Sequence, residues 1–144
     1  MNSKLSTGTW LLLEEVDSTQ AEAEKHLRDA SQPPHVIFAR HQSQGRGRFN
    51  RKWESSPGDS LTMSLIFQEY ESHPKPWLIG MAVSIAVAEV IGGQLQWPND
   101  IVINGKKVSG VLTELLPNNS QEKTPVIGVG VNPVSYTHLR AHET

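Results

Sequence analysis

The sequence predicts an α+β fold, with a mixed, largely antiparallel sheet and helices that flank it. Short apolar runs of strand length alternate along the chain with two longer helical patterns. Asn104-Gly105 lies between two of the short runs, which is a strong signal for a β-hairpin and therefore for antiparallel neighbours. With 144 residues the chain is long enough for one domain with a modest core.

The first half of the chain is expected to fold as strand, helix, strand and strand. Thr19 as N-cap, with Glu22 three residues later, is typical of a capping box at the start of the helix. Leu61, Met63 and Leu65 alternate on one face of the last strand, which predicts that this face is buried. The expected elements are a buried strand over residues 9–16, a helix over residues 20–30, and strands over residues 36–39 and 60–67.

The second half is expected to contain one apolar helix and four short strands. Pro74-Lys75-Pro76 interrupts the chain before the helix, and Gly92-Gly93 ends it. Because the helix carries few polar residues, we expect it to belong to the core. Its expected bounds are residues 77–91, and the strands cover residues 95–97, 101–103, 108–115 and 126–131, with a polar loop over residues 117–124.

The composition excludes several classes of function. A formal net charge of −2 gives no global basic surface of the kind that nucleic-acid-binding domains carry. The chain has no cysteine, which excludes disulfides and thiolate chemistry and fits a reducing cytoplasm. No signal peptide is visible, and the longest apolar stretch is too short to span a bilayer. We therefore expect a cytoplasmic location and no membrane partner.

The most distinctive stretch is residues 45–53, Gly-Arg-Gly-Arg-Phe-Asn-Arg-Lys-Trp, with four cations and two glycines. A local excess of positive charge on a slightly acidic chain indicates that this stretch binds an anion. The glycines let backbone N–H groups approach that anion, and arginine forks can hold carboxylate or phosphate oxygens. The stretch therefore predicts a flexible loop that wraps a small phosphorylated or carboxylated ligand. A nucleic-acid contact by the same residues is the alternative.

Three further motifs accompany this loop. They are Asp17-Ser18-Thr19-Gln20, Trp97-Pro98-Asn99-Asp100 and Gly105-Lys106-Lys107-Val108-Ser109-Gly110, with Glu114 just after the last. Taken singly they can be a helix cap, a turn with its tryptophan in the core, and a pair of exposed hairpin charges. In this order and spacing over residues 10–132, the four motifs resemble the catalytic domain of the biotin–protein ligases. The resemblance implies the biotin/lipoate ligase catalytic fold, which is similar to that of class II aminoacyl-tRNA synthetases.

The resemblance implies a two-step reaction with biotin, ATP and Mg²⁺. Biotin and MgATP would give biotinyl-5′-AMP and pyrophosphate, and a lysine of a biotin carrier domain would then attack the activated carboxyl. The implied partner is the carrier domain of acetyl-CoA carboxylase or a related carboxylase, and a homodimer is allowed. No counterpart of the winged-helix domain of the bifunctional repressor members is visible, so no DNA partner is expected.

The resemblance also assigns roles to residues of the four motifs. Those expected at the biotin ureido ring are Ser18, Thr19 and Gln42, with Gln20 beside them. Those expected at biotin and the adenylate phosphate are Gly45, Arg46, Gly47 and Arg48, with Trp53 as a hydrophobic latch. Those expected at the ATP end are Lys107, near the carboxyl and α-phosphate, and Asn99 and Asp100, which handle ATP, a metal or the acceptor lysine. The expected catalytic residues are Arg48, Lys107 and Asp100, and no residue is assigned as a metal ligand.

The chain also departs from the family pattern. Gln96 stands where the family has a lysine before Trp-Pro-Asn-Asp, which is expected to remove one cation from the pocket, and Gln20 replaces an asparagine. Residues 1–133 are expected to form an incomplete catalytic domain, and residues 134–144 a disordered or non-native tail. The alternative function is therefore a biotin-binding fragment that does not turn over.

Overall fold

The computed structural model describes residues 2–5, 8–29, 32–53 and 60–132, so the prediction made for residues 134–144 lies outside the described part. Its strands are β1 (Asn2–Leu5), β2 (Gly8–Val16), β3 (Val36–Gln42), β4 (Leu61–Ile66), β5 (Gln94–Gln96), β6 (Asp100–Ile103), β7 (Lys106–Pro117) and β8 (Lys123–Val131). Its helices are α1 (Thr19–Asp29) and α2 (Trp77–Ile91), with 3-10 turns η1 (Arg48–Asn50) and η2 (Gln68–Tyr70).

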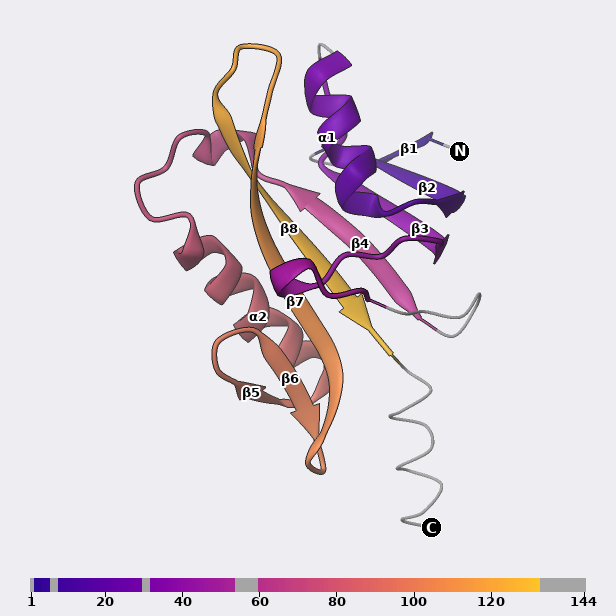
Figure 1. Ribbon diagram of the computed structural model, residues 1–144, viewed down its shortest axis with the longest axis vertical. Helices are drawn as coiled ribbons and strands as arrows, with labels where there is room; N and C mark the ends of the chain where they lie inside the picture. Colours follow the sequence, from indigo (N-terminus) through magenta and orange to yellow (C-terminus); the bar gives the residue numbers. More distant parts are fainter. Residues whose placement is uncertain (1, 6–7, 30–31, 54–59, 133–144) are drawn as a thin grey trace.

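The strands form an eight-stranded sheet in the order β1-β2-β3-β4-β8-β7-β6-β5. Strands β2 and β3 pair in parallel through the connection that carries α1, and the other neighbouring pairs are antiparallel. The predicted class, a mixed and largely antiparallel sheet with flanking helices, is therefore confirmed. In Figure 1 the sheet twists through the centre of the molecule, with α1 above it and α2 along its left side.

Helix α1 begins with a different cap from the one predicted. The Ser18 hydroxyl accepts a hydrogen bond from the Ala21 N–H at 3.0 Å, so Ser18 is the N-cap and Thr19 is the first helical residue. The predicted capping box is wrong, because Glu22 then lies one position too far along the helix to complete it. The Thr19 N–H instead donates to the Gln42 side chain at 2.7 Å. This contact ties the start of the helix to the end of β3.

Two hydrophobic clusters occupy the two faces of the sheet. Helix α1 places Ala23 and Leu27 on one face, where both side chains are almost fully buried. Helix α2 covers the other face with Ala88 and half-buried valine and isoleucine side chains. The buried residues that complete the α1 cluster are Ile37, Ile66, Leu116 and Val126, and those that complete the α2 cluster are Ile101, Val108, Val111, Ile127 and Val129.

Helix α2 has the predicted bounds, but it is not uniformly core. Its buried positions are small: Gly80, Ser84 and Ala88. A Cβ on Gly80 would lie 1.9 Å from the Thr113 hydroxyl oxygen, so the helix packs very closely on β7 at this point. The large side chains left exposed on the helix are Trp77, Leu78, Ile85 and Val90. No helix in the described residues has the length and apolar character needed to cross a membrane.

The more deeply buried face of strand β4 is the polar one, and not the face of Leu61, Met63 and Leu65 that the sequence pattern predicted. Thr62 and Ser64 are buried, whereas Leu61 is 44% exposed. Met63 and Leu65 are partly buried and pack against the α2 cluster. The polar face is buried because its hydroxyls have partners: Thr62 donates to the Ala39 carbonyl at 2.9 Å, and Ser64 lies among side chains of α1.

The remaining predicted boundaries differ by a few residues. The Asn104-Gly105 hairpin is confirmed, and both residues have positive φ values of 51° and 77°, as a type I′ turn requires. Strand β1 and the two 3-10 turns were not predicted. Strand β3 continues to Gln42, β5 lies one residue earlier, β7 reaches Pro117, and β8 begins at Lys123. The longer β3 carries Gln42 to the site described next.

Candidate active site

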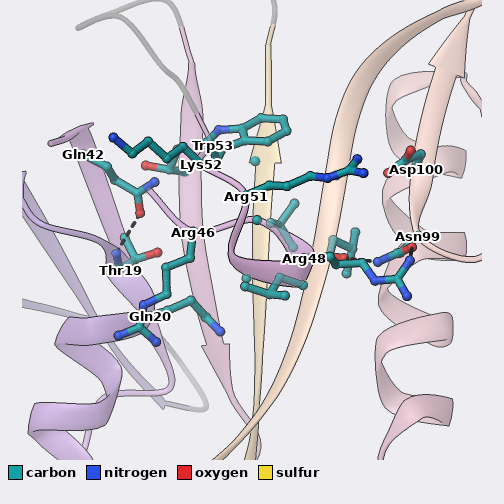
Figure 2. Close-up of a pocket in the computed structure, with 18 of the residues that line it drawn as sticks. Thr19, Gln20, Gln42, Arg46, Arg48, Arg51, Lys52, Trp53, Asn99 and Asp100 are labelled. Atoms are coloured by element: carbon teal, nitrogen blue, oxygen red, sulfur yellow. Dashed lines mark hydrogen bonds between the residues drawn. The ribbon is translucent and has the colours of Figure 1, made fainter. Parts of the chain in front are cut away.

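A cavity of about 220 Å³ lies between the first turn of α1, residues 42–53 and strands β4, β6, β7 and β8. Figure 2 shows how side chains from these separate segments converge on it. The sequence-predicted residues that line it are Thr19, Gln20, Gln42, Arg46, Gly47, Arg48, Trp53, Asn99, Asp100 and Lys107. The two that do not line it are Ser18, which caps α1, and Gly45, which is buried at the start of the loop.

Glycines of β7 and β8 form the floor of the cavity. On β8, Gly128 and Gly130 alternate with apolar residues that face α2, so the floor has no side chains of its own. A Cβ on Gly130 would lie 2.4 Å from the Trp53 indole, and one on Gly110 would lie 3.2 Å from it. The indole therefore rests directly on the sheet backbone. A Cβ on Gly128 would lie 3.0 Å from the Gln20 amide carbon, so Gln20 rests on the sheet in the same way.

Residues 45–53 form a closed hairpin over the cavity. The Trp53 N–H donates to the Gly45 carbonyl at 2.9 Å, and the Gly47 N–H donates to the Arg51 carbonyl at 2.6 Å. Phe49 turns the chain at the tip with a positive φ of 56° and is 79% exposed. A Cβ on Gly45 would lie 2.3 Å from the Trp53 carbonyl oxygen, so this position requires glycine. Glycine at this position therefore allows the two sides of the hairpin to approach each other closely.

Arg46 is paired with two carboxylates. Its guanidinium donates to both oxygens of Glu114 at 3.2 and 3.3 Å, and lies 3.6 Å from a Glu24 oxygen. In Figure 2 the side chain runs from the loop toward Gln20. The guanidinium is therefore directed at α1 and β7, and most of its charge is already balanced.

Arg48 and Lys107 lie at the other end of the cavity. Arg48 donates to the Asn99 side-chain carbonyl at 2.9 Å, and the Asn99 amide donates to the Val111 carbonyl at 2.8 Å. The Lys107 ammonium lies 3.1 Å from an Asp100 oxygen and 5.7 Å from the Trp53 ring centre. The Lys107 and Asp100 side chains are 49% and 39% exposed, and the bond between Arg48 and Asn99 lies on the surface. An incoming anion can therefore compete for both cations.

Arg51 is a lining residue that the sequence analysis did not assign. It lies on the cavity, and in Figure 2 its side chain extends toward Asp100. Its guanidinium forms no ion pair within the described part of the chain. The signal was present in the sequence, since Arg51 is the third arginine of the Gly-Arg-Gly-Arg-x-x-Arg pattern. Conversely, Gln96 does not line the cavity, and Trp97 is 69% exposed and not a core residue.

The inner end of the cavity is polar and buried, and Arg46, the cation beside Gln20, is paired with Glu114 and Glu24. Thr19 and Gln20 are 2% and 3% exposed, and Gln42 is 8% exposed. The Ser64 hydroxyl lies 2.6 Å from the Gln20 carbonyl oxygen and 2.7 Å from the Thr19 hydroxyl. The cavity therefore has a neutral hydrogen-bonding end and a cationic end, with the Trp53 indole between them.

Residues 12–132 match the model of the Biotin/lipoate A/B protein ligase family. This match covers most of the chain, and the chain belongs to that family. The Bifunctional ligase/repressor BirA of Bacillus subtilis (strain 168) is 35% identical over 123 residues, which are 81% of this chain and 38% of that protein. The Biotin--[acetyl-CoA-carboxylase] ligase of Paracoccus denitrificans is 30% identical over 129 residues, covering 84% of this chain and 53% of that protein.

Solved structures show the same fold. The biotin protein ligase from Aquifex aeolicus in complex with biotin and ATP superposes with a TM-score of 0.62 at 33% identity, over 85% of this chain and 51% of that one. The biotin protein ligase from Leishmania major in complex with biotinyl-5-AMP gives a TM-score of 0.66 at 29% identity, over 85% and 56%. This chain thus spans between about two fifths and three fifths of the length of these relatives.

Proposed function

We propose that this chain forms the biotin- and adenylate-binding part of a biotin–protein ligase. Such an enzyme activates biotin with ATP to biotinyl-5′-AMP and transfers the biotin to a lysine of a carrier domain. The single observation that carries the proposal is the polarity of the cavity, which joins a buried neutral end to a cationic end. Biotin has the same polarity, because it carries an uncharged ureido ring at one end and a carboxylate at the other.

The neutral end suits the ureido ring. Thr19 and Gln42 offer hydroxyl, amide and carbonyl groups there. Because these side chains are uncharged, they can bind an uncharged ligand without the cost of removing a charge from water. Leu112, which pairs with Gly128 across the sheet and lines the cavity, gives apolar surface for the rest of the ring system and the chain. The indole of Trp53, packed on Gly130, closes one side of this space and keeps water out of it.

The cationic end suits the reacting anions. A biotin carboxylate and an ATP phosphate repel each other, so the main task of the site is to hold both and to neutralise their charge. We assign this task to Arg48, Arg51 and Lys107, which line the cavity. We assign Arg46 a smaller share, because its guanidinium is already paired with Glu114 and Glu24.

The proposed steps follow from this arrangement. A carboxylate oxygen of biotin attacks the α-phosphorus of ATP, the bond from that phosphorus to the bridging oxygen breaks, and pyrophosphate leaves. A neutral lysine amine of the carrier then attacks the biotinyl carbonyl carbon, the bond to the AMP oxygen breaks, and the amine loses a proton. Asp100 is the acidic residue among the described lining residues, so it is the group we expect to meet the incoming lysine.

Mg²⁺ is expected to arrive with ATP and not as a resident ion. Within the described residues no three acidic or histidine side chains converge to hold a metal. Mg²⁺ binds through one or two carboxylates, phosphate oxygens and water, and Asp100 can supply one carboxylate beside the phosphate site. The ion would neutralise charge on the leaving pyrophosphate. The acceptor we propose is the biotin carrier domain of acetyl-CoA carboxylase or of a related carboxylase.

Calorimetry with three ligands tests the proposal against its alternatives. We expect biotin and ATP to bind to the chain, and a short oligonucleotide to bind with much lower affinity. Binding of biotin without any pyrophosphate release in the presence of MgATP would select a binding fragment that lacks turnover. Oligonucleotide affinity with a steep salt dependence, and no biotin affinity, would select a nucleic-acid-binding module. The inward pairing of Arg46 with Glu114 argues against that last function.

A further inference from the structure

We infer that Glu114 and Ser64 are positioning residues, which act through Gln20 to make the Thr19 hydroxyl a hydrogen-bond acceptor toward the ligand. Only the identity of the ligand rests on the function proposed above. The residues form a chain of contacts from β7 through α1 to β4, behind the neutral end of the cavity. Neither Glu114 nor Ser64 lines the cavity itself, so each would act on the ligand through another side chain.

The contact chain begins at the Glu114 carboxylate. One of its oxygens accepts from the Gln20 amide nitrogen at 2.9 Å, and both accept from the Arg46 guanidinium. The same Gln20 nitrogen lies 3.4 Å from the Val126 carbonyl oxygen. Turning the Gln20 amide over would set its carbonyl oxygen against these acceptors, which is unfavourable in a buried place. The amide orientation is therefore fixed, with its carbonyl oxygen toward Ser64.

The orientation of Gln20 decides what Ser64 can do. The Ser64 oxygen lies 2.6 Å from the Gln20 carbonyl oxygen, which can only accept, so the single Ser64 proton goes to Gln20. The Ser64 oxygen then has to accept in its other contact, the one with the Thr19 hydroxyl at 2.7 Å. The Thr19 proton is thereby directed at Ser64. Only lone pairs of the Thr19 oxygen remain for the cavity, which it lines.

This polarity gives a specificity rule for the inner end of the cavity. A ligand N–H group that faces Thr19 finds an acceptor, whereas a ligand oxygen in the same place meets lone pairs. Sites built to pair with a particular ligand group strongly reject analogues that lack it. We therefore expect the chain to favour a cyclic urea over a cyclic carbamate, which has an oxygen in place of one ring N–H.

The first test needs no ligand. The resonances of the Gln20 side-chain amide are followed by NMR in wild type, Glu114→Gln and Ser64→Ala. Both variants should shift them, because each changes a direct partner of that amide. Glu24→Gln is the matched control for the first variant, since it removes the other carboxylate near Arg46 without touching Gln20. Unchanged Gln20 resonances in Glu114→Gln would overturn the inference whether or not the chain binds biotin.

The second test measures recognition. Dissociation constants are compared for biotin and its two cyclic-carbamate isomers, each with oxygen in place of one ring N–H. Wild type should bind one isomer at least about tenfold more weakly than biotin, and Ser64→Ala should reduce that ratio to about threefold or less, because the freed Thr19 hydroxyl can then donate. Ser84→Ala is the control, since Ser84 is equally buried and donates to the Gly80 carbonyl within α2. An unchanged ratio in Ser64→Ala would overturn the inference.

The two tests also separate this inference from the proposed function. If wild type does not bind biotin at all, the proposed function fails, and the NMR comparison still decides whether the contact chain exists. If biotin binds and both carbamate isomers bind as tightly as biotin, the proposed function stands and the role assigned to Glu114 and Ser64 is wrong.

Discussion

Arg48→Ala is the substitution that most clearly separates a binding role from a structural one. Arg48 lies in the exposed hairpin over the cavity, and within the described residues its guanidinium makes one hydrogen bond, to the side-chain carbonyl of Asn99. It also lies 4.7 Å from the centre of the exposed Phe49 ring. A guanidinium has five N–H groups, so Arg48 can reach a phosphate and keep Asn99.

The expected loss of folding free energy in Arg48→Ala is smaller than the expected loss of binding free energy. Losing one exposed hydrogen bond should cost less than about 1 kcal/mol of folding free energy, because Asn99 keeps its bond to the Val111 carbonyl and its freed oxygen meets water. Losing a charge-assisted contact with a phosphate should cost about 1.5–3 kcal/mol, which is roughly a 10- to 150-fold rise in the dissociation constant.

The assay is calorimetry with biotin and with a non-hydrolysable biotinyl-adenylate analogue, alongside urea unfolding. Arg48→Ala should weaken the analogue by at least about tenfold and change unfolding by less than about 1 kcal/mol. Arg28→Ala, an exposed arginine on α1 away from the cavity, is the control and should change neither. A variant that unfolds, or one that binds the analogue like wild type, would refute the reasoning.

Three further substitutions test other parts of the site. Gly130→Ala puts a methyl group where the Trp53 indole rests, so tryptophan emission should shift and biotin should bind at least about tenfold more weakly; an unchanged spectrum would contradict the packing. In Gln20→Asn the side chain is too short to reach both Glu114 and Ser64, so urea unfolding should show that the folding free energy falls by about 1–3 kcal/mol; wild-type stability would mean that neither contact contributes. Gln96→Lys should change ATP and biotin affinity by less than about threefold, because residue 96 is exposed and outside the cavity lining; a selective gain for ATP would place it at the phosphates.

The elements that sequence alone located well are those fixed by local chemistry. Helix α2 has the predicted bounds because prolines precede it and Gly92, with a φ of 72°, ends it. The Asn104-Gly105 turn fixes the β6–β7 hairpin in the same way. Local signals could not show which face of β4 is more buried. That outcome depends on partners from α1 that lie 44 and 45 residues away in the sequence from Ser64.

The site was predicted as a set of residues but not as an arrangement. Ten of the residues that line the cavity were identified by the motifs, whereas Arg51 and Lys52 were not. A family pattern records single positions. It does not record pairing, so the contact of Arg46 with Glu114 and Glu24 could not be foreseen. The cap was assigned to Thr19 because two adjacent residues, Ser18 and Thr19, are both good N-caps. Only the geometry of the helix start decides between them.

Formation of biotinyl-5′-AMP is the measurement that tests the central claim most directly. The chain is incubated with biotin and MgATP, pyrophosphate release is followed, and the bound product is identified by mass spectrometry, with Arg48→Ala measured in parallel. A version extended to the length of its relatives serves as the reference for full activity. The account predicts biotin-dependent pyrophosphate release and an adenylate that stays bound to wild type but is lost from Arg48→Ala. Absence of biotin-dependent pyrophosphate release and of bound adenylate in both the chain and its extended version would contradict the account.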